Sequence, residues 1–169
     1  MRIVGIDPGL TGAVACATIN PSSGEVIAPE VHDLPVTDFV DQRKVPDPVG
    51  LYDLLRTMTP DLIVLEHVEA RPGRGSVSSW RFASGFGATM AACQLAVDGP
   101  RVHLVRPSIW KSALGLSSDK AASLTAARSA FPQVADQLKR VKDDGRAEAL
   151  LLIQYYRQHL LRAGEMEVI

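Results

Sequence analysis

Two acidic residues stand where apolar segments of the sequence end. Asp7 closes the short β-branched run 2–7 and is followed by Pro8-Gly9, and Glu66 lies near the end of the apolar run 61–68. A carboxylate in an otherwise apolar strand is costly to bury unless it is paired or bound to a metal. One such residue could be a core acid with satisfied hydrogen bonds. Two on neighbouring strands would repel each other unless a cation lay between them, so the pair indicates a metal site.

A second pair of acids has helical spacing. Asp144 and Glu148 are four residues apart, so on a helix they would share one face, about a turn apart. Alone, they could be an N-cap and a surface charge. With Asp7 and Glu66 they offer hard oxygen ligands suited to Mg²⁺ or Mn²⁺. Two such ions about 4 Å apart can activate a water and stabilise the leaving oxygen in phosphodiester cleavage. The four acids therefore predict a metal-dependent nuclease, with all four as catalytic and metal-binding residues.

Hydrophobic patterning predicts the elements that position these acids. Three strands joined by short turns come first, and strands alternating with helices follow. The predicted strands are 2–7, 13–19, 25–35, 61–68 and 101–105; the predicted helices are one from Asp47-Pro48 to Pro60, then 80–97, 107–114, 119–130 and 144–161. This order describes an α/β protein with a mixed five-stranded sheet, three antiparallel strands and then parallel strands, flanked by helices. Ligands gather beyond the strand ends of such sheets, where Asp7 and Glu66 stand.

Composition and length limit the class of protein. The 169 residues are 46% hydrophobic and 22% charged, which is typical of a soluble globular protein, and we expect one domain over 1–169. No stretch approaches the roughly 20 apolar residues of a membrane span. The first apolar run is broken too early by Asp7 for a signal peptide, so we expect a cytoplasmic location and no membrane partner. Cys16 and Cys93 fit no metal spacing and are expected to be buried, reduced thiols.

Basic residues are concentrated in the second part of the chain. Residues 1–70 hold 11 acidic and 4 basic side chains, whereas residues 71–162 hold 14 basic and 6 acidic ones, although the net charge is only -1. This asymmetry indicates a polyanionic partner, but a chance distribution over a solvated surface would give the same counts. The basic residues that bracket the acids are expected to contact DNA phosphates, which would give salt-dependent affinity without reading sequence. They are Arg71, Arg74, Lys111, Lys120, Lys139, Arg140, Lys142 and Arg146.

The ordered motifs resemble those of the RuvC-type Holliday junction resolvases, which are crossover junction endodeoxyribonucleases. The resemblance covers 1–157 and rests on Gly5-Ile6-Asp7-Pro8-Gly9, on Leu65-Glu66-His67-Val68, and on Asp144 with Glu148. The first motif is weak alone, because sugar kinases share something like it, whereas the ordered set is specific. The segments Pro107-Ser108-Ile109-Trp110-Lys111 and 142–149 look closer to the chloroplast and phage-type branch than to the housekeeping bacterial enzyme.

The resemblance implies a ribonuclease H-like fold and a homodimer that resolves four-way DNA junctions by paired nicks. It implies two Mg²⁺ or Mn²⁺ ions per active site. By match, Asp7 would bridge both ions, with Glu66 on one and Glu148 on the other. The fourth ligand of the housekeeping enzyme stands three residues before the final acid, where this chain has Gly145. Asp144 is the first choice for this ligand and Asp143 the second.

Other positions leave alternatives open. The housekeeping enzymes have an aromatic wedge three residues after the strand glutamate, where this chain has Glu69. Trp80 or Phe82 could instead stack on a junction base, or both could anchor the long helix in the core. His67 could assist proton transfer near Glu66, or it could pack on the other face of the sheet. The small residues of the helix 80–97 could form a dimer seam or pack on the sheet of their own chain.

Three rival functions are weighed. In an actin or sugar-kinase type of fold, 7–12 would be a phosphate loop. Such proteins need a second domain and a second glycine-rich loop, which this chain lacks, so no nucleotide cofactor is expected. A non-catalytic junction-binding protein would have lost an acidic ligand, yet all four positions can be filled. A ribonuclease H-like nuclease acting on RNA–DNA hybrids, or more broadly on flaps and forks, remains an alternative.

Overall fold

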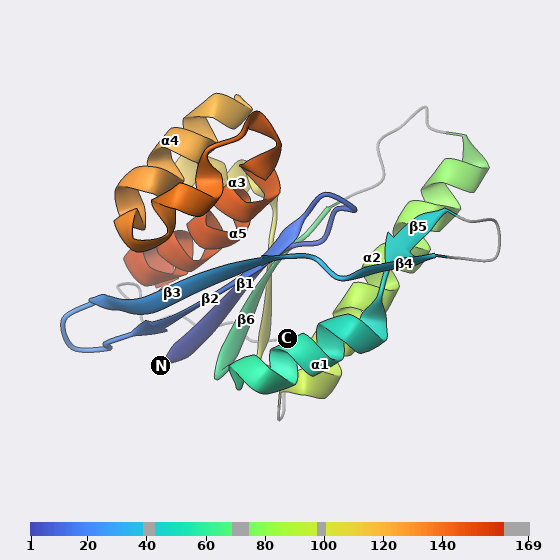
Figure 1. Cartoon of the computed structure of the whole chain (residues 1–169), viewed down its shortest axis with the longest axis horizontal. Coiled ribbons are helices and arrows are strands. Elements are labelled where there is room, and N and C mark those ends of the chain that lie inside the picture. Colours follow the sequence, from blue (N-terminus) through green and yellow to red (C-terminus); the bar gives the residue numbers. More distant parts are fainter. Residues whose placement is uncertain (39–42, 69–74, 98–100, 161–169) are drawn as a thin grey trace.

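A mixed sheet forms the centre of the computed structural model, which describes residues 1–38, 43–68, 75–97 and 101–160 (Figure 1). Its five strands lie in the order β3-β2-β1-β6-β7. They are β1 (Arg2–Asp7), β2 (Ala13–Ile19), β3 (Val26–Asp33), β6 (Leu62–Glu66) and β7 (Val102–Val105). The first three pair antiparallel, and β6 pairs parallel with both β1 and β7. This is the predicted arrangement.

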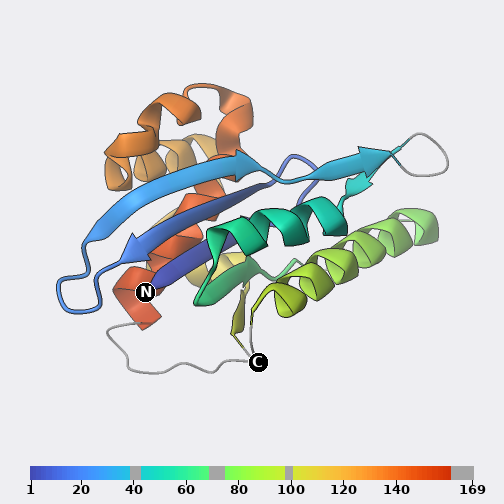
Figure 2. The same cartoon turned by 60° about the horizontal axis from the view of Figure 1, so that its bottom comes forward.

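Helices cover both faces of the sheet (Figure 2). On one side lie α1 (Pro48–Met58) and α2 (Ser76–Ala96); on the other lie α3 (Pro107–Ala113), α4 (Lys120–Ala130) and α5 (Asp144–Tyr155). Strand alternation divides the core accordingly, because successive side chains point to opposite faces. Ile3, Leu62 and Val64 join the core under α5, whereas Val4 and Ile63 join the core under α1 and α2. Asp7 and Glu66 share the alternation of Ile3 and Val64, so they belong to the α5 face.

Local signals explain where α1 begins and ends. The side chain of Asp47 accepts a hydrogen bond from the backbone N–H of Val49, and Pro48 occupies the first helical turn. Thr59 adopts the left-handed conformation, with φ at 46°, and its N–H bonds back to the carbonyl of Leu55. Pro60 follows directly, as predicted for the end of this helix.

Several boundaries differ from the prediction. A hairpin of β4 (Val36–Asp38) and β5 (Lys44–Pro46), separate from the main sheet, was not predicted, because its strands are only three residues long and one ends in proline. It lies beside the N-terminal half of α2 (Figure 1). The segment between α4 and α5 forms the 3₁₀ turns η1 (Pro132–Leu138) and η2 (Val141–Asp143). The last helix changes to a π turn, η3 (Tyr156–Leu160).

Two composition-based expectations can be compared with these elements. Among the described residues, no helix is long and apolar enough to cross a membrane. Cys16 and Cys93 are buried and unbonded to each other, as expected for reduced thiols.

The α2 helix begins at Ser76, earlier than the predicted Trp80, because the serine-rich start of the helix gives a weak helical signal in the sequence.

Candidate active site

Asp7 and Glu66 lie at the ends of neighbouring parallel strands. The β1–β6 register pairs Ile6 with Leu65, and the two acids are the next residue of each strand. Glu66 is only 6% exposed, and Asp7 is partly buried. The backbone N–H of Gly9 donates to Asp7 Oδ1 at 3.2 Å, which fixes the carboxylate as the chain turns toward β2. The structure therefore brings the two acids to one edge of the sheet, as predicted.

Two glycines let α5 approach β1 closely enough to bring a second pair of acids to this edge. A Cβ atom on Gly5 would overlap the carbonyl oxygen of Ala149 in α5. A Cβ atom on Gly145 would overlap the carbonyl oxygen of Thr11 and lie 3.1 Å from Asp7 Oδ2. Side chains at these positions would push the helix away from the strand. The first two turns of α5, which carry Asp144 and Glu148, therefore stand beside Asp7.

The four acids interact electrostatically. Removal from water and the negative charges of Glu66 and Glu148 raise the pKa of Asp7 to about 7, and Asp144 adds to this effect. The N–H of Gly9 opposes the shift. Burial also raises the pKa of Glu66. Because the site disfavours the ionised form of its own carboxylates, a bound cation would stabilise that form.

Two lysines already pair with the acids of α5. Lys111 Nζ lies 2.7 Å from Glu148 Oε1, with the two side chains 18% and 16% exposed. Lys120 reaches from α4 to Asp144, and this bond raises the pKa of the lysine. Both lysines were predicted to contact DNA phosphates; in this structure each contacts a carboxylate instead.

The donor set is suited to a hard divalent cation, because it consists of carboxylate oxygens from Asp7, Glu66, Asp144 and Glu148. In the part of the chain that the structure describes, however, no three acidic, histidine or cysteine side chains are drawn together as a ready metal-binding group. The lysine contacts give a physical reason, since Glu148 and Asp144 each bond to an ammonium group rather than facing a shared ion. The four carboxylates therefore fit a divalent cation by the type of their donor atoms and by their negative charge, and Lys111 and Lys120 hold two of them away from a common point.

Asp143 has a different environment from these four acids. It is 3% exposed, and one of its oxygens accepts the backbone N–H of Arg140 at 2.7 Å while the other accepts the guanidinium at 2.7 and 3.0 Å. The guanidinium bonds lower the pKa of Asp143. These bonds close the turn that leads into α5. Asp143 therefore has a structural partner for both oxygens, whereas its neighbour Asp144 faces the acid cluster.

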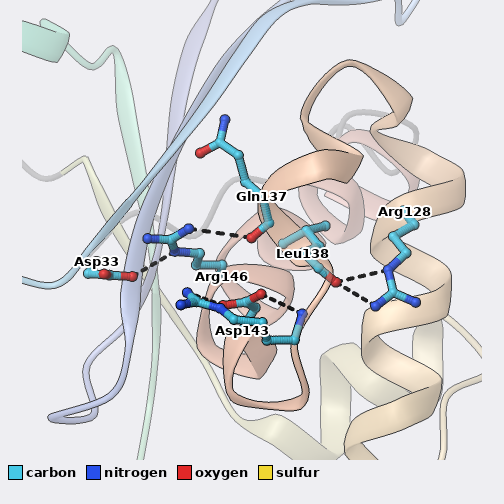
Figure 3. A network of polar contacts seen from close by, with 7 residues as sticks. Asp33, Arg128, Gln137, Leu138, Asp143 and Arg146 are labelled. Carbon is cyan, nitrogen blue, oxygen red and sulfur yellow. Dashed lines mark hydrogen bonds and ion pairs between the residues drawn. The ribbon is translucent and has the colours of Figure 1, made fainter.

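Arg146 is held within the same region by polar contacts of its own (Figure 3). It donates to Asp33 Oδ1 at 2.6 Å and to the carbonyl of Gln137 at 3.4 Å, tying α5 to the end of β3 and to η1. Nearby, Arg128 of α4 donates to the carbonyl of Leu138. Arg140 and Arg146 were predicted as phosphate contacts, and both have carboxylate partners within the protein.

The other predicted contact residues are distributed over the surface. Arg71, Arg74 and the wedge position Glu69 lie outside the described residues. Lys139 and Lys142 are exposed, and Lys139 pairs with Asp136.

The structure also separates the alternatives for the aromatic and histidine candidates. Trp80 is 62% exposed, so the alternative that it anchors α2 in the core is wrong; Phe82 is partly buried. His67 packs on Phe86 of α2, with ring centroids 5.9 Å apart, so it lies on the face opposite to Glu66. The packing role of His67 is confirmed.

Sequence reasoning missed one residue that contacts the acids. Trp110 is fully buried, and its Nε1 donates to Glu66 Oε1 at 2.9 Å. The sequence gives no signal for this bond beyond the position of Trp110 a few residues after β7, the strand that pairs with β6.

A cleft beside the site was also not predicted. It runs between the β4–β5 hairpin, the β1–β2 turn and α2, and its lining includes Leu10, Pro46 and Trp80.

No model of a protein family and no curated protein sequence matches the chain. Its structure is similar to solved structures of RuvC from Thermus thermophilus. One, in complex with a Holliday junction substrate, is 18% identical with a TM-score of 0.61, over 97% of this chain and 96% of that chain. Another is 17% identical with a TM-score of 0.60, over 100% of both chains. The chain therefore has the ribonuclease H-like fold of RuvC, with an acid cluster at one edge of its sheet.

Proposed function

We propose that this protein is a metal-dependent endodeoxyribonuclease that resolves four-way DNA junctions by paired nicking. The observation that carries the proposal is the placement of four carboxylates, Asp7, Glu66, Asp144 and Glu148, at one sheet edge, where burial and the neighbouring negative charges raise the pKa of Asp7 to about 7. Mutual repulsion of this kind favours bound cations. The RuvC-like fold, seen in one neighbour with a Holliday junction substrate, supports branched DNA as the substrate class.

The four carboxylates, Asp7, Glu66, Asp144 and Glu148, would hold two Mg²⁺ or Mn²⁺ ions. When bound, the ions would activate a water and stabilise the leaving oxygen of the phosphodiester. The protein's own residues supply the orientation: Gly9 fixes Asp7, and the glycine contacts of α5 place Asp144 and Glu148. Lys120, whose side chain is 67% exposed, could also reach a DNA phosphate beside the cluster.

Exposed groups around the cluster support DNA binding. Lys120 contacts Asp144 in the first turn of α5, Lys139 and Lys142 are exposed in the segment before that helix, and Trp80 offers an exposed ring for stacking on an unpaired base. Arg146 is a poorer phosphate ligand than predicted, because Asp33 and Gln137 occupy its guanidinium. Contacts of Arg71 and Arg74 with DNA stay predictions. The likeness of segments 107–111 and 142–149 to the chloroplast and phage-type branch also stays a prediction.

The test is a nicking assay on a panel of four-way junction, fork, flap, duplex and RNA–DNA hybrid, each with Mg²⁺ and with Mn²⁺. We expect preferential, paired cleavage of the four-way junction. Asp7→Asn should abolish nicking and leave junction binding intact; full activity in this variant would refute the metal assignment. Preferred cleavage of the hybrid would favour the ribonuclease H alternative. Junction binding without cleavage in either metal would favour a non-catalytic junction-binding protein.

The fourth ligand is tested by a pair of neighbouring variants. Asp143 keeps an oxygen for the N–H of Arg140 when changed to Asn, so Asp143→Asn should stay folded and active. Asp144→Asn should be far more damaging to nicking, because it removes a charge from the cluster that faces Asp7. The reverse order would move the fourth ligand to Asp143.

We also propose a homodimer that forms through α2. One face of this helix packs against the rest of the same chain, and Thr89, Ala92 and Cys93 are buried there. The opposite face carries small or apolar residues at helical spacing that are exposed in the single chain. These are Ser84, Gly87, Ala91 and Leu95, the last of them 73% exposed. Sedimentation should give about twice the chain mass of 18.2 kDa, and Ala91→Glu should yield a monomer. A wild-type monomer at micromolar concentration would contradict paired nicking.

A further inference from the structure

Glu66 is the most deeply buried acid of the cluster, and a tryptophan holds its carboxylate. Glu66 is 6% exposed, and its Oε1 accepts the indole N–H of Trp110 at 2.9 Å. Trp110 is fully buried in the same core cluster as Leu124 and Phe131. Its ring is therefore fixed by packing, and the direction of its N–H is fixed with it.

The helix that carries Trp110 begins directly beyond the site. Val105 of β7 pairs with Glu66, and Pro107 starts α3 two residues later. The next residue after Trp110 is Lys111, whose Nζ lies 5.1 Å from the Trp110 ring centroid and 2.7 Å from Glu148 Oε1. Adjacent residues of one short helix thus hold carboxylates from β6 and from α5.

The two contacts differ in chemistry. Lys111 is a cation, so it neutralises the carboxylate that it holds. The indole N–H is a neutral donor with no acceptor function, so it orients Glu66 and leaves the negative charge in place. It occupies one lone pair of Oε1 and none of Oε2. A carboxylate held in this way remains available to a divalent cation, and its side chain has less conformational freedom to lose when the cation binds.

We propose that Trp110 is a positioning residue that presents the carboxylate of Glu66 to a divalent cation. This inference rests on the proposed function only in taking Glu66 as a metal ligand. Hydrogen bonds to metal ligands from surrounding residues typically contribute 10- to 100-fold in metal affinity. Removal of the N–H should therefore weaken Mn²⁺ binding by about tenfold, although no ligand is lost.

The experiment measures Mn²⁺ binding directly, by calorimetry on the full folded chain without DNA. Wild type is compared with Trp110→Phe and with a variant carrying benzothienylalanine at position 110, which replaces the N–H by sulfur and keeps the ring shape. Tyr156→Phe is the matched control, because Tyr156 is 1% exposed in the same core and its hydroxyl contacts Met1. Both Trp110 variants should bind Mn²⁺ about tenfold more weakly, and the control should bind as wild type does.

A second readout uses the two tryptophans of the chain. In a Trp80→Phe background, Trp110 is the remaining tryptophan, and its fluorescence should change saturably as Mg²⁺ is added. In nicking assays, the Mn²⁺ concentration for half-maximal rate should rise about tenfold in Trp110→Phe, while the rate at saturating Mn²⁺ stays near wild type.

The outcomes separate this inference from the proposed function. If wild type binds Mn²⁺ and the benzothienylalanine variant binds equally well, the hydrogen bond has no positioning role and the inference is overturned. If only Trp110→Phe is weakened, core packing is responsible, which also overturns it. If wild type binds no divalent cation at all, the metal site itself is wrong and the proposed function fails first.

Discussion

Gly145 provides the sharpest test of how the acid cluster is assembled, through the variant Gly145→Ala. The residue lies in the first turn of α5, where the helix crosses the β1–β2 turn. A Cβ atom there would lie 2.9 Å from the Cα of Gly12, 3.1 Å from Asp7 Oδ2, and closer still to the carbonyl oxygen of Thr11. Two of the three neighbours are backbone atoms, so no change of side-chain rotamer can relieve the overlap.

The magnitude follows from two opposing effects. Replacing a helical glycine by alanine stabilises a protein by about 0.5–1 kcal/mol when there is space for the methyl group. Forcing a methyl group into a packed contact costs about 1–3 kcal/mol. We therefore expect a net loss of about 1–2 kcal/mol, or roughly 2–8 °C in Tm for a chain of this size. Ordinary contact begins at 3.4 Å, so α5 must move by at least about 0.5 Å from Gly12. A 1 Å misplacement at an active site can cost about 100-fold in rate, so nicking should fall at least about tenfold.

The assays are thermal unfolding by circular dichroism, with Gly87→Ala as the control, and nicking of a four-way junction, with wild type as the reference. Gly87 is also a helical glycine, but a Cβ atom there meets nothing within 4 Å. In melts below the concentration at which α2 faces associate, the control should gain about 0.5–1 kcal/mol. If Gly145→Ala were as stable as the control and as active as wild type, close approach of α5 to Asp7 would not govern the site.

Three further predictions concern the charged groups. Because the pKa of Asp7 is raised to about 7, the metal-free protein should lose stability as pH rises from about 4 to 7 and change little above that. Asp7→Asn should remove this loss of stability, which is on the order of 2–4 kcal/mol at pH 8. The measurement is thermal unfolding at a series of pH values in the presence of a chelator. A variant whose pH profile is the same as that of wild type would count against the raised pKa of Asp7. Asp143→Ala should cost about 1–3 kcal/mol in urea unfolding, because it removes the buried acceptor of the part-buried Arg140 N–H, while Mn²⁺ affinity stays the same. The exposed Asp33–Arg146 pair should give a coupling of only about 0.5–1 kcal/mol in a double-mutant cycle, and a value several times larger would show that the pair governs α5 docking.

The main sheet could be predicted because its strands carry strong local signals. The runs 2–7 and 61–68 are apolar and bounded by turn residues, and the structure places β1 and β6 within them. The hairpin of β4 and β5 gave no such signal, because each strand is only three residues long and Val36–Asp38 is entirely exposed. Its position depends on contacts with α2, which local sequence does not encode.

The acid cluster could be predicted for a different reason: its strand carboxylates occupy buried positions, where a charged group without a partner costs free energy. Asp7 and Glu66 end buried strands, and this feature is visible in the sequence alone. The different surroundings of Asp143 and Asp144 were not visible, because they depend on which way the side chain of Arg140 extends. The bond from Trp110 to Glu66 joins residues 44 apart in the chain, and only tertiary packing brings them together. The partners of the acids are thus harder to predict than the acids.

The docking of α5 also determines when the growing chain can acquire its full set of acids. The ribosome releases β1 and β6 long before residues 144–155, since synthesis runs from the N-terminus. Until α5 packs against Gly5, the nascent chain holds only Asp7 and Glu66 of the four acids. A partly made or locally unfolded chain therefore carries half of the cluster. If the cluster cuts DNA, that chemistry would require α5 to be in place, so unfinished copies of the chain would not cut the cell's DNA.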